Sequence, residues 1–267
     1  MVELAEFGPV LVVDDDPLSR MLLVALLGKM GCVVAVATNG AEAVAAVGQS
    51  DYAAIIMDCQ MPEMDGYQAT RLIRSAEVPP RRVPIIARTA SSRTAELQRC
   101  LDVGMDDHLA KSSTRTELES VLTHWLVVGS QPPPVGQQSP IAGPALCLDR
   151  SPLTAIRARL TELFEGMDAD VASLSEQLVS SFLARVPKYL QELTIAAKAG
   201  DCSMVMTTAH GLKGAADNLA ANAIGSLAGE LEVLGEDEDL SDAGRLIAKL
   251  EREYSRLRDA LAEPLRL

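Results

Sequence analysis

Aromatic residues are scarce in this sequence, and it has no long apolar run. Phe, Trp and Tyr make up 3% of the 267 residues, although hydrophobic residues of all kinds make up 48%. This apolar content is sufficient for hydrophobic cores, so a disordered chain is excluded. Cores rich in Ala, Leu and Val favour helices, and the length favours two domains over one. The absence of a signal peptide and of any apolar run of about 18 residues predicts a soluble, cytoplasmic protein.

Cysteines are few, scattered and odd in number. They show no C-x-x-C spacing and no histidine at metal-ligand spacing, and they are Cys32, Cys59, Cys100, Cys147 and Cys202. This pattern argues against a disulfide framework and against a zinc site. Reduced cytoplasmic thiols are the expected state.

Basic tracts are also absent, and the net charge is −13. Residues 1–128 carry 11 Lys and Arg against 17 Asp and Glu, and the remainder carries 13 against 20. The acidic excess therefore extends over both halves. Binding to nucleic acid or to an anionic membrane surface needs concentrated positive charge, so neither is expected.

Short apolar runs alternate with amphipathic segments through residues 1–128. The predicted strands are 10–13, 32–36, 53–57, 83–87 and 106–110. Pro17 begins the first helix and Gly31 ends it, and the later helices are expected at about 40–47, 66–74, 94–101 and 118–126. Five alternations of strand and helix predict a doubly wound α/β domain with a parallel five-stranded sheet. Right-handed crossovers place helices on both faces.

Five polar residues fall at the carboxyl ends of these strands, namely Asp14, Asp15, Asp58, Thr89 and Lys111. In a doubly wound sheet this edge holds the functional crevice. Each of these residues alone would be ordinary at a protein surface. Strand formation does not require all five to lie at strand ends, so their joint position indicates a functional site. Clustered carboxylates repel one another unless a cation lies among them. Ligands that are all oxygen atoms favour Mg²⁺ over zinc.

The residue types suit transfer of a phosphoryl group to Asp58. This carboxylate ends a buried apolar run and can attack a phosphoryl group in line, while Mg²⁺ neutralises the phosphate charge. Lys111 can hold one phosphate oxygen as a mobile point charge. The hydroxyl group of Thr89 can donate a hydrogen bond to another.

Four segments resemble the receiver domain of two-component response regulators: residues 13–15, 57–66, 84–90 and 106–111. The resemblance covers about residues 9–127, and it implies a flavodoxin-like receiver domain over residues 1–128. It implies that Asp58 accepts the phosphoryl group and that Thr89 and Lys111 bind and sense it. The implied Mg²⁺ ligands are Asp14, Asp15, Asp58 and the backbone carbonyl of Gln60.

Three positions depart from the receiver pattern. Receivers usually carry Tyr or Phe where this chain has His108, and Pro where it has Ser112; Arg88 is unusual beside the Thr. The acceptor residues are intact, but the usual side chains that relay phosphorylation to the last strand and helix are replaced. His108 is either a pH-sensing side chain or a simple substitution.

The second half is predicted to be helical. Residues 129–149 are rich in Pro, Gly, Gln and Ser and predict an extended tether. Residues 150–267 predict an antiparallel bundle of four or five helices. Asp168 or Asp170 is the expected cap of the second helix, and Pro187 either kinks that helix or begins a new one. Gly200 is expected to end the next helix before Asp201 caps another.

The helix predicted over 201–219 carries the candidate histidine, His210. Its expected apolar stripe is Met204, Thr208, Leu212, Ala215 and Leu219. His210 lies about 200° around the helix from Leu212, so it is expected to face away from the core with Lys213 and Gly214. A neutral imidazole accepts phosphoryl groups, a nearby Lys offsets their charge, and a Gly leaves room for a partner. A solvated surface histidine is the simpler alternative.

Residues 209–214, preceded by Phe182 and the helix over 190–200, resemble the histidine-containing phosphotransfer (HPt) domain of phosphorelays. The resemblance covers about residues 151–261. It implies that His210 exchanges phosphoryl groups with the assistance of Lys213. Ala220 stands where the family usually has Gly, and this is expected to alter packing more than chemistry. His124, beside Trp125, has no such context and is interpreted as structural.

The chain is therefore predicted to be a phosphorelay intermediate rather than an enzyme, because nothing in it resembles an ATP-binding kinase core. A sensor histidine kinase would transfer a phosphoryl group to Asp58. His210 would exchange phosphoryl groups with Asp58, through an intramolecular receiver–HPt contact, or with the receiver of a downstream response regulator, in either direction. A receiver-gated interaction module and a phosphate sink are the alternatives. The short segment before the first strand leaves open a standalone protein or the tail of a hybrid sensor kinase.

Overall fold

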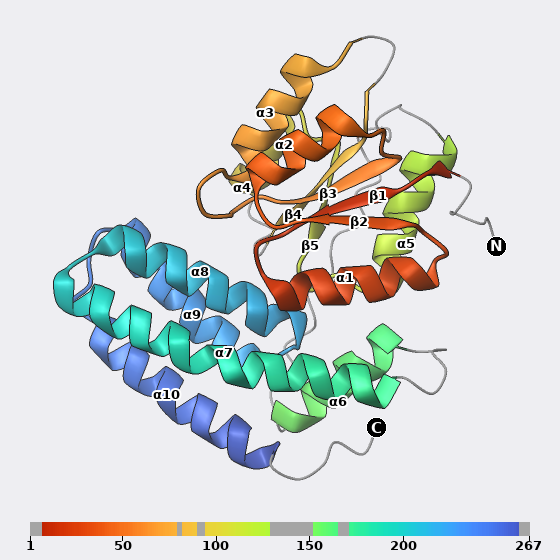
Figure 1. Cartoon of the computed structure of the whole chain (residues 1–267). Coiled ribbons are helices and arrows are strands. Elements are labelled where there is room, and N and C mark those ends of the chain that lie inside the picture. Colours follow the sequence, from red (N-terminus) through yellow and green to blue (C-terminus); the bar gives the residue numbers. More distant parts are fainter. Residues whose placement is uncertain (1–6, 79–81, 90–93, 129–151, 165–170, 262–267) are drawn as a thin grey trace. The chain divides into compact units, whose positions relative to one another are not determined.

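The computed structural model describes residues 7–78, 82–89, 94–128, 152–164 and 171–261. The chain divides into two compact units, Met1–Cys147 and Leu148–Leu267. The first is α/β and the second is helical, as the sequence predicts (Figure 1). The predicted tether at 129–149 and the candidate caps Asp168 and Asp170 lie outside the described residues.

The first unit is built on a parallel five-stranded sheet with the order β2-β1-β3-β4-β5. Its strands are β1 (Val10–Val13), β2 (Val34–Ala37), β3 (Ala54–Asp58), β4 (Ile85–Thr89) and β5 (Asp107–Ala110). The strand order reverses between β1 and β3, which lie side by side. Asp14 follows β1 and Asp58 ends β3, so the two carboxylates meet at the topological switch point.

Helices cover both faces of this sheet (Figure 1). They are α1 (Pro17–Lys29), α2 (Gly40–Gln49), α3 (Gly66–Ala76), α4 (Thr94–Asp102) and α5 (Arg115–Thr123), which continues into the π-helical turn η2 (His124–Val128). One core cluster joins the sheet to α2, α3 and α4. The three central strands, β1, β3 and β4, are buried on both faces, as a covered parallel sheet requires, whereas the edge strands β2 and β5 are partly exposed.

Two strands begin two residues later than the apolar runs predict. Cys32 does not belong to β2, because its N–H bonds to the carbonyl of Leu27 and completes the end of α1 behind Gly31, which has a φ of +78°. Val83 does not belong to β4, because its N–H donates to Glu77 and its carbonyl accepts from Arg74. Partners outside the sheet therefore occupy both backbones: a backbone carbonyl of α1 for Cys32, and two side chains for Val83.

The second unit contains five described helices. They are α6 (Pro152–Phe164), α7 (Val171–Ala199), α8 (Cys202–Asn218), α9 (Asn222–Glu236) and α10 (Ala243–Ala260). Pro187 lies inside α7 and neither ends it nor begins a new helix. Gly200, with a φ of +71°, ends α7, and the side chain of Asp201 caps α8 by accepting from the N–H of Met204. α8 packs against both α7 and α9, so it is covered on two sides.

Within the described ranges, none of the helices combines the length and the apolar character that a membrane crossing would need.

Candidate functional sites

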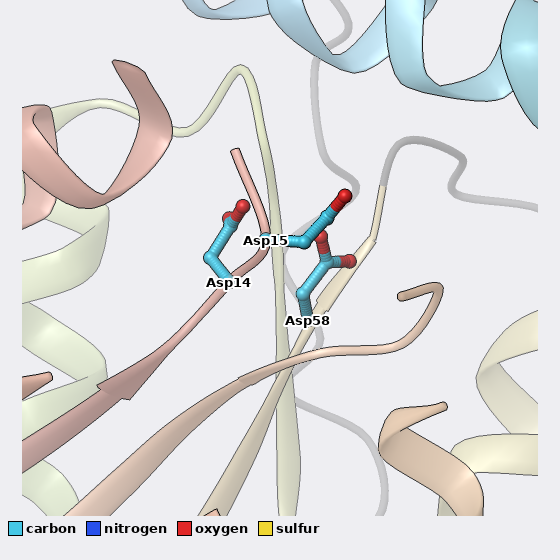
Figure 2. A group of neighbouring side chains, drawn as sticks. All are labelled: Asp14, Asp15 and Asp58. Carbon is cyan, nitrogen blue, oxygen red and sulfur yellow. The ribbon is translucent and has the colours of Figure 1, made fainter. Parts of the chain in front are cut away.

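Three carboxylates gather at the carboxyl edge of the sheet (Figure 2). Oxygen atoms of Asp14, Asp15 and Asp58 all lie within 4.8 Å of one another. Asp14 and Asp58 are buried, with 0% and 1% of their surfaces exposed, whereas Asp15 is exposed. Asp14 and Asp15 come from the turn after β1, and Asp58 comes from the end of β3. The pairing of these two strands brings the carboxylates together.

The turn after Asp58 is held tightly by backbone contacts. The N–H of Cys59 donates to the carbonyl of Arg88, and the N–H of Gly66 donates to the carbonyl of Cys59. A Cβ atom at Gly66 would lie 2.0 Å from the carbonyl oxygen of Asp58, so only glycine fits there. The N–H of Gln60 donates to Oδ1 of Asp58 over 3.2 Å. These bonds fix where the acceptor carboxylate lies.

Lys111 extends from the end of β5 to Asp58. Its Nζ lies 2.6 Å from Oδ2 of Asp58, and its backbone N–H donates to the carbonyl of Thr89 over 2.7 Å. Burial raises the pKa of Asp58 to about 6; the neighbouring carboxylates add to this rise and Lys111 opposes it. Burial acts to lower the pKa of Lys111, but Asp58 and Asp14 outweigh it and hold that pKa above its ordinary value. Thr89 is buried at the end of β4.

Arg88 contributes a second buried cation, for which sequence reasoning gave no role. It is 4% exposed. Its Nη1 lies 3.4 Å from Oδ2 of Asp14 and also donates to the hydroxyl of Ser19, which itself bonds to Oδ2 of Asp14. Its Nη2 donates to the carbonyl of Lys111 over 3.2 Å. Burial lowers the pKa of Arg88, and the Asp14 and Asp58 carboxylates counteract this.

His108 and Ser112, the other two unusual receiver positions, show no described contact with the acidic cluster. His108 lies on β5 with Nδ1 3.8 Å from Oδ1 of Asp107, and Asp107 also accepts a hydrogen bond from the indole of Trp125. Ser112 is exposed. A pH-sensing role for His108 stays a prediction.

The second site lies in the helical unit, around His210. Nδ1 of His210 lies 2.6 Å from Oε1 of Glu232, and Nζ of Lys213 lies 3.1 Å from Oε2 of the same carboxylate. His210 and Lys213 come from α8, and Glu232 comes from α9. One carboxylate therefore links the two residues that the sequence singled out.

The predicted orientation of His210 is wrong. The residue is 5% exposed instead of solvated, and Gly214 is buried as well, whereas Met204, expected in the core, is 50% exposed. The reason is that α7 and α9 both cover α8, so its buried arc is wider than one apolar stripe. His210 lies in the part of that arc where α9 supplies Glu232.

Glu232 controls the protonation pattern of the site. Burial alone would raise the pKa of Glu232, but the contacts with His210 and Lys213 outweigh burial and lower it to about 2. At neutral pH the carboxylate is therefore ionised and can only accept hydrogen bonds. A neutral His210 must then carry its proton on Nδ1, which leaves the lone pair on Nε2.

Two family matches correspond to the two units. The response regulator receiver domain family matches residues 10–123, and the Hpt domain family matches residues 177–260. The chain is a receiver domain followed by an Hpt domain. Receiver and Hpt domains are both components of phosphorelays. Neither matched domain is a kinase domain.

Several similar proteins are named as sensor proteins or histidine kinases. Sensor protein GacS of Pseudomonas syringae pv. syringae is 31% identical over 93% of this chain and 28% of its own length. Sensor histidine kinase GacS of Pseudomonas protegens is 30% identical over 77% of this chain and 22% of its own length. Hybrid signal transduction histidine kinase L of Dictyostelium discoideum is 41% identical over 44% of this chain and 7% of its own length. The chain thus spans less than a third of these relatives.

Solved structures match the receiver domain. The receiver domain of a sensor histidine kinase from Pseudomonas aeruginosa, described with magnesium in its active-site cleft, is 41% identical; the match covers 45% of this chain and 97% of that one, with a TM-score of 0.42. A complex of the Saccharomyces cerevisiae phosphotransfer protein Ypd1 with the receiver domain of Ssk1 matches 44% of this chain and 88% of that one at 29% identity, with a TM-score of 0.42.

Sequence reasoning missed Glu232 of the Hpt domain. This residue lies on α9, 22 positions after His210, and in the sequence it is one of several acidic residues on an amphipathic helix. The sequence carries no local signal for the pair, because the contact exists only once α9 packs on α8. An acidic residue next to the apolar positions of α9 was the sole available indication.

Proposed function

We propose that Asp58 of the receiver domain accepts a phosphoryl group from the phosphohistidine of a sensor histidine kinase. We also propose that His210 of the Hpt domain exchanges phosphoryl groups with receiver aspartates, either Asp58 or that of a response regulator. One observation carries the proposal: one chain holds a buried carboxylate paired with Lys111 in an acidic cluster and a buried histidine oriented by Glu232. The free thiols of the described cysteines support a cytoplasmic location.

The acidic cluster fits a hard divalent cation. It offers three carboxylates within 4.8 Å of one another, and such oxygen ligands suit Mg²⁺. We assign Asp14, Asp15, Asp58 and the backbone carbonyl of Gln60 as the residues that hold it. When bound, Mg²⁺ supplies positive charge that offsets the charge on the phosphoryl oxygens.

The receiver side chains then have defined tasks. An oxygen of Asp58 attacks phosphorus, the bond from phosphorus to the donor imidazole nitrogen breaks, and that nitrogen leaves with the electron pair. Lys111, 2.6 Å from Asp58, is placed to pair with a phosphoryl oxygen as the carboxylate loses its charge. The hydroxyl of Thr89, at the end of the adjacent strand, donates to another phosphoryl oxygen.

The Hpt domain accepts the group on Nε2 of His210. As Nε2 bonds to phosphorus, the bond from phosphorus to the donor aspartyl oxygen breaks, and the donor carboxylate leaves with the electron pair. The imidazole gains positive charge, and Glu232 stabilises that charge through Nδ1–H. The same carboxylate holds Lys213 one turn away, where its ammonium group offsets the phosphoryl charge. Glu232 therefore orients both the acceptor ring and its assisting cation.

Phosphate transfer from a purified sensor kinase tests the proposal. The full chain is incubated with the kinase, labelled ATP and Mg²⁺ as wild type, Asp58→Asn and His210→Gln, with His124→Gln as the matched histidine control. Label is expected on Asp58 as a base-labile acyl phosphate in wild type and in His210→Gln. Acid-labile label on His210 is expected only when Asp58 or another phosphorylated receiver is present, and His124→Gln behaves as wild type.

Label that never reaches His210 from any receiver contradicts the relay and supports the interaction module instead. The phosphate sink is tested separately by the lifetime of the phosphoryl group on a response regulator. A lifetime that shortens on addition of the wild-type chain, but not of Asp58→Asn, supports the sink.

A further inference from the structure

Arg88 connects three segments at the carboxyl edge of the receiver sheet. Its guanidinium group contacts Asp14 in the turn after β1, Ser19 in α1 and the carbonyl of Lys111 after β5. The residue lies on β4, which is buried along its whole length, and it is 4% exposed. A guanidinium group is desolvated at such a position and is tolerated only with ionic and hydrogen-bond partners.

The pocket therefore balances most of its charge from within the protein. Each of the two buried carboxylates has a buried cation of its own, because Lys111 pairs with Asp58 and Arg88 pairs with Asp14. Asp15 is the exposed member of the cluster. Without Arg88 the pocket would lose a buried cation, and the attraction of its carboxylates for a divalent cation would be greater by the effect of one nearby positive charge.

Asp14 is also engaged through both of its carboxylate oxygens. Oδ1 accepts from the N–H of Asp16 over 2.9 Å, while Oδ2 accepts from Ser19 and faces Arg88. A cation that binds Asp14 shares these oxygens with existing partners, and it approaches a fixed positive charge that cannot be deprotonated in a protein. Both effects oppose metal binding at this carboxylate.

We propose that Arg88 is a positioning residue that balances the charge of the acidic cluster and thereby weakens its affinity for Mg²⁺. The inference rests on the proposed function, because it takes the cluster as the Mg²⁺ site. Its consequence is a receiver whose pocket is held together in the absence of metal, and whose phosphorylation requires a higher Mg²⁺ concentration than the three carboxylates alone would set.

The test measures Mg²⁺ binding rather than phosphotransfer. Mg²⁺ alone is titrated into the full chain by isothermal titration calorimetry at constant ionic strength. Arg88→Met removes the positive charge and replaces the arginine stem with an apolar side chain of similar length. Arg88→Lys keeps the positive charge. Arg82→Met is the matched control, because Arg82 is half exposed, pairs with Asp106 and lies in the same unit. Asp58→Asn establishes that the measured site is the acidic cluster.

Arg88→Met is expected to bind Mg²⁺ about tenfold more tightly than wild type, a change of about 1.4 kcal/mol. Arg88→Lys should stay within about threefold and Arg82→Met within about twofold. A second readout follows from the same balance: without metal Arg88→Met should unfold at a lower temperature than wild type, and added Mg²⁺ should raise its melting temperature more. A purely structural arginine would change the melting temperature without changing Mg²⁺ affinity.

Equal or weaker Mg²⁺ binding by Arg88→Met overturns the inference. If Arg88→Met does not fold, Arg88→Gln gives the same comparison, because its amide still donates hydrogen bonds while the charge is lost. Absence of Mg²⁺ binding to both wild type and Arg88→Met would remove the metal assignment and this inference together. Phosphorylation of Asp58 is measured independently by the kinase experiment, so failure of the proposed function remains distinguishable.

Discussion

Glu232 contacts both residues of the proposed Hpt site. It holds Nδ1 of His210 at 2.6 Å and Nζ of Lys213 at 3.1 Å, and its side chain is 12% exposed. The pKa of Glu232 is lowered from 4.5 to about 2. A carboxylate whose pKa is lower in the folded than in the unfolded state stabilises the fold above the unfolded value, and this contribution disappears as pH falls through the folded value.

Glu232→Gln is therefore expected to lower the free energy of unfolding of α8 and α9 by about 3 kcal/mol at pH 7, because the pKa of Glu232 differs by about 2.5 between the folded and unfolded states. The difference from wild type should hold down to about pH 4.5 and vanish near pH 2. Urea unfolding followed by hydrogen exchange of α8 and α9 at a series of pH values checks this. Glu236→Gln on the exposed end of α9 is the control. A pH-independent difference would contradict the assigned pKa.

Ala220 lies between α8 and α9 with a φ of +53°, in the left-handed region that favours glycine. Ala220→Gly should stabilise the helical unit by about 0.5–1 kcal/mol, because the Cβ strain of a left-handed residue is removed. Ala221→Gly is the matched control: Ala221 is buried with a φ of −77°, so that variant should be destabilised by a similar amount. Hydrogen exchange of α8 and α9 measures both. Destabilisation by Ala220→Gly would contradict the backbone assignment.

At the scale of elements, the start of α3 is the tightest point near the receiver site. A Cβ at Gly66 would meet the carbonyl oxygen of Asp58 at 2.0 Å, so Gly66→Ala must displace backbone. We expect a loss of about 3 kcal/mol in stability and a slower phosphorylation of Asp58. Gly48→Ala in α2 has no atom within 4 Å of the new Cβ and should stabilise by about 0.5–1 kcal/mol. The melting temperatures of both variants and their rates of Asp58 phosphorylation are measured. A Gly66→Ala variant as stable as wild type would contradict the close contact with the carbonyl oxygen of Asp58.

Local signals in the sequence predicted most elements. The strands β1 and β3 are continuous apolar runs that lead to an Asp, and Asp201 caps α8 through its side chain, as predicted. The starts of β2 and β4 were placed two residues early, because an apolar residue such as Val83 has the same pattern whether its backbone bonds to a strand or to a side chain. Of the two alternatives for Pro187, the start of a new helix is wrong, because α7 continues through this residue, and a kink in α7 stays a prediction.

The sequence predicted the proximity of site residues only in the receiver domain, where the sheet topology brings them to one edge. Parallel strands deliver Asp14, Asp58 and Lys111 to one edge, so their proximity followed from the strand pattern. The burial of His210 and its contact with Glu232 depend on how α9 packs on α8. Helical periodicity predicts one buried face. It does not show that a second helix, here α9, covers another face of the same helix.

At the scale of the whole molecule, the chain behaves as two units with separate sites. Mg²⁺ at about 100 times its dissociation constant should add about 2.7 kcal/mol to the stability of the unit that binds it. Hydrogen exchange with and without Mg²⁺ should therefore show added protection in β1, β3 and β5 and none in α8 and α9. Asp58→Asn should reduce the effect. Equal protection of both units, or protection of the helical unit alone, would contradict the assignment of the metal to the acidic cluster.

Each acceptor residue has its described partners within its own unit: Asp58 has Lys111, and His210 has Glu232. In genetic terms, these described partners are encoded in the same segment as the acceptor that they contact. A recombination event between the two coding segments would transfer an acceptor together with the side chains that orient it, whereas an event inside either segment would separate them. Shuffled libraries of such chains should therefore retain a working acceptor most often when the crossover falls between the two domains.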